Sequence, residues 1–120
     1  MFAVILIGLM VAAPGFVNAD GVDKPFAVFC HAVWCEPCKR MQKEMAKVTN
    51  MDLVDYRDID IDEEPELAGK LMEGRTVPQL IMYFKVDGKM RKNVHYGFKT
   101  AKQIEAIFHD AHVQSVRQVH

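Results

Sequence analysis

The chain has 120 residues, half of them apolar, and these include seven phenylalanines and one tryptophan. This length supports one compact domain with a hydrophobic core and is too short for two. Fifteen basic and sixteen acidic residues leave a net charge of −1, so no overall field attracts nucleic acid or an anionic membrane. The charge is uneven, because residues 52–66 hold eight acids and one base, whereas residues 85–102 hold six bases and one acid. We expect two solvated faces of opposite sign.

The first 19 residues have the pattern of a secretory signal peptide. Residues 2–13 are almost wholly apolar, Pro14-Gly15 would break a helix, and residues 17–19 form a cleavage pattern before Asp20. An uncleaved anchor and a first core strand are the alternatives, since no basic residue precedes the apolar run. The run is shorter than the roughly 20 residues of a spanning helix, which weakens the anchor interpretation. We therefore predict removal of residues 1–19 and a periplasmic location, where disulfides can form and persist.

The mature chain begins with a strand, a helix and a second strand. The apolar run 26–31 is typical of a buried strand. A helix then starts near residue 35, since apolar side chains recur at the spacing of one helical face, at Cys38, Met41, Met45 and Val48. Residues 53–62 carry the apolar positions of a second strand.

The second half is predicted to hold a helix, two strands and a last helix. A short helix over residues 63–74 has Pro65 near its start and Gly74 as its stop. Residues 78–84 form the most continuous apolar run, which predicts a central strand. The pair Asp87-Gly88 then predicts a tight turn into a strand over residues 89–96.

The last helix is predicted to open with a capping box of Thr100 and Gln103. The element order is therefore β-α-β-α-β-β-α, an α/β fold with a four-stranded mixed sheet and helices on both faces. We expect each β-α-β crossover to give a parallel strand pair and the hairpin to add an antiparallel edge. The domain should span residues 20–112, with a flexible tail over residues 113–120.

All three cysteines lie within the segment "FCHAVWCEPCKRM", at positions 30, 35 and 38. An iron–sulfur cluster of this spacing needs a fourth cysteine, which the chain lacks. Zinc would need His31, but Cys30 and His31 are neighbours in a strand and point to opposite faces. We therefore expect no metal and no other cofactor.

A reactive dithiol fits the spacing better. If the helix begins at Cys35, that sulfur lies beside unpaired backbone N–H groups and the positive end of the helix dipole, where a thiolate is stabilised. Cys38 follows one turn later on the inward face. Cys35 would attack a disulfide, and Cys38 would resolve the mixed disulfide. A purely structural disulfide is the alternative, but so small a ring adds little stability. Cys30 is expected to be a buried, unreactive strand residue.

The segment "FCHAVWCEPCK" resembles the thioredoxin superfamily, with its strand followed by W-C-x-x-C-K. "TVPQL" at residues 76–80 is similar to that family's loop with a cis-proline facing the dithiol, and "YGF" at residues 96–98 to the glycine that ends its last strand. The resemblance covers residues 24 to about 110 and is nearest to small secreted thioredoxin-like reductases, including the C-terminal domain of the membrane thiol:disulfide interchange protein. It implies a minimal thioredoxin-like fold, without the family's first strand and helix.

The resemblance also implies the substrate-binding residues. Pro78 should be cis and pack against Cys35 and Cys38, and the backbone of Val77 should pair with an extended substrate segment. Trp34 and Pro37 would add substrate contacts beside the sulfurs.

Three positions depart from the family pattern. Phe29 replaces the buried aspartate that assists proton transfer, and His31 replaces an aromatic residue. Asp58 falls near the family's buried lysine and is a candidate substitute acid or base, although a solvated carboxylate is the plainer interpretation. Glu36 opposes a thiolate at Cys35 and favours a reducing dithiol, partly offset by Lys39 and Arg40.

The sequence therefore predicts a monomeric thiol:disulfide reductase whose substrates are oxidised protein thiols and whose electrons come from a membrane donor of the interchange type. An oxidase or isomerase of the same fold remains an alternative. A non-catalytic binding or chaperone module is another.

Overall fold

The computed structural model describes residues 24–116 of the chain. Eight elements follow one another, and their bounds are β1 (Phe26–His31), α2 (Glu36–Met45), η2 (Met51–Leu53), β2 (Asp55–Asp60), α3 (Pro65–Leu71), β3 (Gln79–Val86), β4 (Lys89–Tyr96) and α4 (Ala101–Val116). The predicted order of strands and helices is confirmed, with a short 3-10 turn, η2, added before β2. None of the helices in residues 24–116 is long and apolar enough to span a bilayer.

The four strands form one mixed sheet in the order β2-β1-β3-β4. Strand β1 is parallel to β2 and antiparallel to β3, and β3 is antiparallel to β4. The hairpin between β3 and β4 turns at Asp87 and Gly88, which both have positive φ, at 55° and 77°. Both values suit the two-residue turn that matches the twist of the strands.

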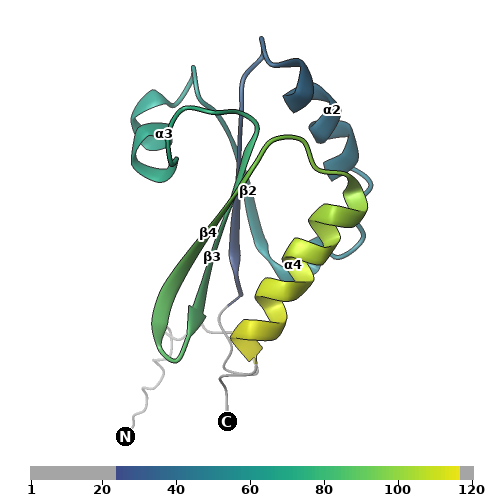
Figure 1. The fold of residues 1–120 in the computed structure, drawn as a ribbon, viewed down its shortest axis with the longest axis vertical. Coiled ribbons are helices and arrows are strands. Elements are labelled where there is room, and N and C mark those ends of the chain that lie inside the picture. The colour runs from purple at the N-terminus through teal and green to yellow at the C-terminus, as the bar shows by residue number, and fades with distance from the viewer. Residues whose placement is uncertain (1–23, 117–120) are drawn as a thin grey trace, which may run out of the picture.

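The expectation of a parallel pair from the second crossover is wrong. Helix α3 has seven residues and is about 10 Å long, whereas the six residues of β2 extend about 20 Å. The helix is too short to carry the chain back along the sheet. Strand β3 therefore starts at the end where β2 finishes and runs the opposite way (Figure 1).

Helices cover both faces of the sheet, as predicted (Figure 1). On one face α2 and α4 bury a core with β1 and β3, made of Ala27, Phe29, Met41, Met45, Val54, Leu80, Met82, Phe84, Ile104, Phe108 and Ala111. On the other face α3 covers a smaller cluster of Val28, Cys30, Ile59, Ala68 and Ile81. The alternation along β1 divides its side chains between the two cores.

The last helix begins with the predicted capping box. The Gln103 backbone N–H donates to Thr100 Oγ1 at 3.2 Å, and the Thr100 backbone N–H donates to Gln103 Oε1 at 2.9 Å. The helix runs to Val116, so the prediction of a tail from residue 113 is wrong for residues 113–116. There the helix continues because Ser115 is buried and its hydroxyl donates to the Ala111 carbonyl at 3.0 Å. Residues 117–120 and the predicted signal peptide, 1–19, lie outside the described residues.

Candidate active site

Cys35 and Cys38 form a disulfide at the point where β1 ends and α2 begins, at the top of Figure 1. Cys35 is the N-cap of α2, and its Cα lies 5.2 Å from that of Cys38. The Cys38 backbone N–H donates to Cys35 Sγ at 3.2 Å. The sulfur of Cys35 thus accepts one of the N–H groups that a helix leaves unpaired at its N-terminus, which is the interaction that stabilises a thiolate there.

Both sulfurs are largely shielded from solvent in the disulfide. Cys35 is 5% exposed and Cys38 is 1% exposed, so the predicted order of accessibility holds while the difference is small. They form a cluster with Ala32, against which Ile61 and Val77 pack. Cys38 also lies on the inward face of α2 with Met41 and Met45, as predicted. Apolar neighbours exclude water from Cys38 more fully than from Cys35.

Trp34 lies at the surface beside the disulfide. Its side chain is 62% exposed, and its Nε1–H donates to Asp62 Oδ2 at 2.8 Å. Val33, before it, is 67% exposed. The hydrogen bond holds a large indole in one orientation at the edge of the site, where it presents apolar area to solvent.

Glu36 and Pro37 form the first turn of α2. Pro37 is half-buried and needs no hydrogen-bond partner for its nitrogen at this position. Glu36 is exposed, and Lys39 Nζ lies 3.5 Å from its Oε2. The carboxylate next to Cys35 is therefore partly balanced by a solvated ammonium.

The Val77–Pro78 peptide bond is cis, as the resemblance implied. Pro78 is fully buried, and its carbonyl accepts the Gly97 backbone N–H at 2.9 Å. Gly97 has a φ of 86°, which accounts for glycine at the end of β4. Val77, before Pro78, packs against the cluster of Ala32, Cys35 and Cys38.

Gln79 supports this loop and was missed by the sequence interpretation. Its side chain is wholly buried, and Oε1 accepts the Glu73 backbone N–H at 2.9 Å. Its Nε2 donates to the carbonyls of Glu73 and Thr76, both at 3.1 Å. A glutamine inside the apolar run after Pro78 was the available signal, since a buried amide needs partners.

Asp58 contacts a histidine rather than the disulfide. Its carboxylate is 58% exposed, and Oδ1 lies 3.7 Å from His31 Nε2. The ring of His31 packs against Phe29, with centroids 5.2 Å apart, and its Nδ1 lies 3.5 Å from Gln42 Nε2 on α2. Phe29, His31 and Asp58, where the sequence departs from the family, thus form one line of contacts. His31 joins this line to α2 through Gln42.

Cys30 lies away from the disulfide, in the core under α3. It is a free, fully buried thiol, and burial raises its pKa to about 11. It behaves as an apolar strand residue, as predicted. Within residues 24–116 no three His, Cys, Asp or Glu side chains gather in a way that could hold a metal ion.

Comparison with known proteins gives the class to which this geometry belongs. The sequence model of the family described as Thioredoxin matches residues 16–110. A thioredoxin of Borreliella burgdorferi is 28% identical over 90 residues, which are 73% of this chain and 74% of that protein. A chloroplastic thioredoxin z has a similar structure, with a TM-score of 0.64 and 26% identity, over 93% of this chain and 99% of the other.

A further structure, mitochondrial thioredoxin 3 of Saccharomyces cerevisiae in its oxidised form, has a TM-score of 0.59 and 25% identity, over 72% of this chain and 78% of that one. The fold, the disulfide at a helix N-terminus and the cis-proline loop define a thioredoxin-type thiol:disulfide oxidoreductase. The chain belongs to the thioredoxin family.

Proposed function

We propose that this oxidoreductase works as a reductase of protein disulfides, with Cys35 as the attacking thiol and Cys38 as the resolving thiol. The observation that carries this assignment is the position of Cys35 as N-cap of α2, where its sulfur accepts the Cys38 backbone N–H. Only the thiolate attacks a disulfide, and this position favours the thiolate of Cys35 over that of the more deeply buried Cys38.

The reaction begins with the reduced form. The thiolate of Cys35 attacks one sulfur of the substrate disulfide, and the other substrate sulfur leaves as a thiolate. Cys38 then loses its proton and attacks Cys35, which forms the Cys35–Cys38 disulfide and releases the second substrate thiolate. The substrate gains two electrons and two protons overall, and a dithiol donor must return two electrons to the protein. We place that donor in the membrane, as an interchange-type partner.

The direction follows from the surroundings of Cys35. Strongly oxidising members of this class stabilise their reduced thiolate form. Here the next residue is Glu36, an exposed carboxylate that disfavours the thiolate and is only partly balanced by Lys39 at 3.5 Å. This electrostatic arrangement favours a reducing dithiol over an oxidase or isomerase. The relatives are thioredoxins, which supports the same assignment.

Three residues supply the substrate surface in this proposal, and a fourth, Pro78, positions one of them. Trp34 offers exposed apolar area, Pro37 shapes the first turn beside it, and Val77 packs against the cluster that holds the sulfurs. The backbone of Val77 would pair with an extended substrate segment. The cis-proline, Pro78, fixes the direction of that backbone. We further propose that residues 1–19 direct export to the periplasm, so that protein recovered there should begin at Asp20.

Trapping the mixed disulfide tests the roles of the two cysteines. A Cys38→Ser variant should accumulate a covalent complex with substrates that hold an intact disulfide, such as insulin, because the resolving thiol is missing. A Cys35→Ser variant should form none and should lose insulin reduction with dithiothreitol as the electron source. Mass spectrometry of the complex identifies the linked sulfur. Insulin reduction that persists in Cys35→Ser would reject the assigned nucleophile.

A further inference from the structure

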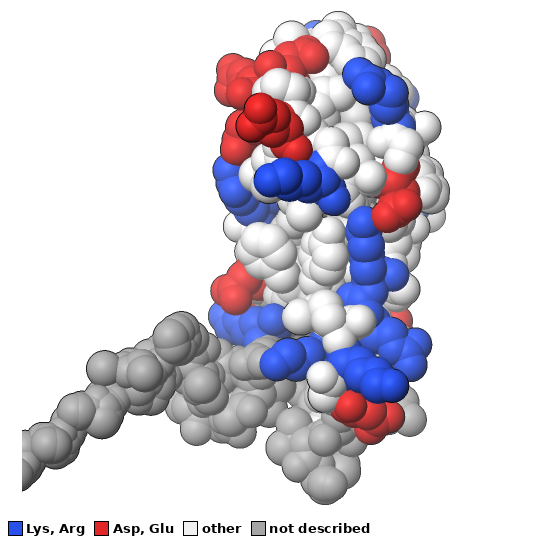
Figure 2. Space-filling model, turned by 90° about the vertical axis from the view of Figure 1, so that its left-hand side faces the viewer, with Lys and Arg blue, Asp and Glu red and all other residues white. Residues whose placement is uncertain are grey.

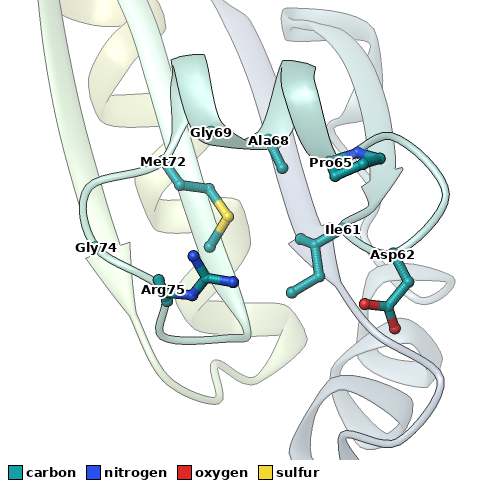
Figure 3. A pocket seen from close by; sticks show the side chains of 8 residues that line it. All are labelled: Ile61, Asp62, Pro65, Ala68, Gly69, Met72, Gly74 and Arg75. Atoms are coloured by element: carbon teal, nitrogen blue, oxygen red, sulfur yellow. The ribbon is translucent and has the colours of Figure 1, made fainter.

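A pocket opens beside the disulfide, between α3 and the loop that leads to β3 (Figure 3). Its walls include Ile61, Ala68, Met72 and Arg75, and its volume is about 210 Å³. Ile61 also packs against the cluster of Ala32, Cys35 and Cys38, so the pocket and the disulfide share a wall. Arg75 lies two residues before Val77, which packs against the same cluster.

The size of the pocket suits one side chain. Sites for whole small molecules occupy roughly 300 to 1,000 Å³. A volume of about 210 Å³ is below that range. The pocket therefore fits a residue of a bound segment better than a separate small ligand.

The pocket has an apolar floor, and one cation, Arg75, lies at its edge. Ile61, Ala68 and Met72 belong to the core cluster under α3. Arg75 is exposed, and among residues 24–116 no carboxylate pairs with it. Figure 3 shows its guanidinium pointing toward Ile61, with the Asp62 carboxylate on the far side of that residue. Asp62 already accepts the Trp34 indole N–H.

We propose that this pocket binds an acidic side chain, with glutamate preferred, next to the disulfide cysteine of a protein substrate. The two methylenes of a glutamate cover Ile61 and Met72 while its carboxylate pairs with Arg75. In an extended segment, residues two positions apart point to the same side. A glutamate two positions from the attacked cysteine therefore reaches the pocket. The proposal rests on the proposed function and adds a substrate preference to it.

The test uses the reduced full-length protein and three peptides. Each peptide holds one disulfide and carries Glu, Gln or Lys two positions from the attacked cysteine. The single tryptophan, Trp34, lies beside the disulfide, so its fluorescence reports oxidation in a stopped-flow measurement. We expect the Glu peptide to react about fivefold faster than the Gln peptide, the upper size for a solvent-exposed charge pair. Arg75→Gln should abolish that preference, and Arg75→Glu should make the Lys peptide fastest.

Lys70→Gln is the matched control. Lys70 is an exposed base on α3 that does not line the pocket, and the substitution changes the net charge by the same amount as Arg75→Gln. It should keep the preference for Glu. A Glu preference that survives Arg75→Gln, or an equal slowing of all three peptides, would overturn the proposed pocket occupant. A protein that reduces none of the peptides would overturn the proposed function, and this proposal with it.

Discussion

Three cysteines within nine residues have different surroundings, and these give them different chemistry. Cys35 is a helix N-cap, Cys38 lies one turn further on the inward face, and Cys30 is in the core under α3. Desolvation disfavours a charged sulfur, whereas N–H groups at a helix N-terminus favour it. The reactive pair is therefore separated from the third thiol by a change of sheet face as well as by five residues of sequence.

We expect Cys30 to resist alkylation in the folded, reduced protein. With a pKa of about 11, about one Cys30 thiol in a thousand is ionised at pH 8, and the residue is fully buried. Brief treatment with iodoacetamide followed by peptide mass spectrometry should find the label on Cys35 and none on Cys30. The same treatment in urea should label all three cysteines. Labelling of Cys30 at the rate of Cys35 in the native protein would contradict this account.

At the scale of the elements, two glutamates join α2 and α4. Glu44 on α2 accepts the Ala101 backbone N–H at 2.7 Å, in the first turn of α4. Glu105 on α4 accepts both the backbone N–H and the hydroxyl of Thr49 at 2.9 Å, in the chain just after α2. These hydrogen bonds, with Lys47 beside Glu44, lower the pKa of both carboxyls. Each helix thus supplies a carboxylate to the end of the other.

These contacts predict a loss of stability in acid. A lowered pKa in the folded state stabilises the fold above the unfolded value, near 4.5, and this stabilisation is lost as the pH falls through the folded value. Glu105→Gln should therefore unfold at lower urea concentration than the parent at pH 7, and the difference should shrink by pH 3. Urea titrations from pH 3 to pH 7 measure it.

Glu66→Gln is the control for that titration. Glu66 is exposed on α3, and its side chain takes no part in the contacts between α2 and α4. Glu66 is the acid in the first turn of α3, so its loss should cost some stability at pH 7, but less than Glu105→Gln. A constant difference between Glu105→Gln and the parent across the range would show that the Glu105 carboxylate does not act through its charge.

The elements could be predicted from sequence where the signal is local. The helix that starts at Cys35, the turn at Asp87-Gly88 and the box of Thr100 with Gln103 each depend on a few adjacent residues, and each is confirmed. The direction of β3 depends on how far α3 reaches along the sheet, and no short pattern of residues predicts that distance. The apolar content of that strand is the same in either direction.

The features of the site also divide into those that short motifs predict and those that depend on contacts between distant residues. The disulfide and the cis bond before Pro78 follow from short motifs and are confirmed. The bond between Trp34 and Asp62 joins residues 28 positions apart, and the pocket wall at Arg75 depends on the loop that Gln79 holds. Such contacts form only when distant segments fold together, so the sequence alone did not predict them.

At the scale of the whole molecule, acidic and basic side chains form separate patches on the face seen in Figure 2. Acidic side chains gather mostly at the upper end, whereas basic ones are spread over the face and are most numerous at the lower end, around the hairpin of β3 and β4. The acidic run of residues 52–66 and the basic run of residues 85–102 both extend along the sheet, because β2 and β4 each reach from one end of it to the other. The junction of β1 and α2, which holds the disulfide, is also at the upper end (Figure 1).

That placement bears on the direction of electron transfer. The carboxylate of Glu36, next to Cys35 and only partly balanced by Lys39, makes the thiolate form less stable and the disulfide form correspondingly easier to reach. In the proposed function, a protein poised in this way gives electrons to substrates rather than taking them. The reducing direction is the central claim of the proposed function.

The equilibrium with glutathione, followed by Trp34 fluorescence, measures that claim most directly. Thioredoxin-type reductases have reduction potentials of about −270 mV, and the most oxidising proteins of this fold have about −120 mV. We predict a value for the Cys35–Cys38 pair near the reducing end of that span. A potential above about −180 mV, where disulfide isomerases and oxidases lie, would contradict the proposed reductase.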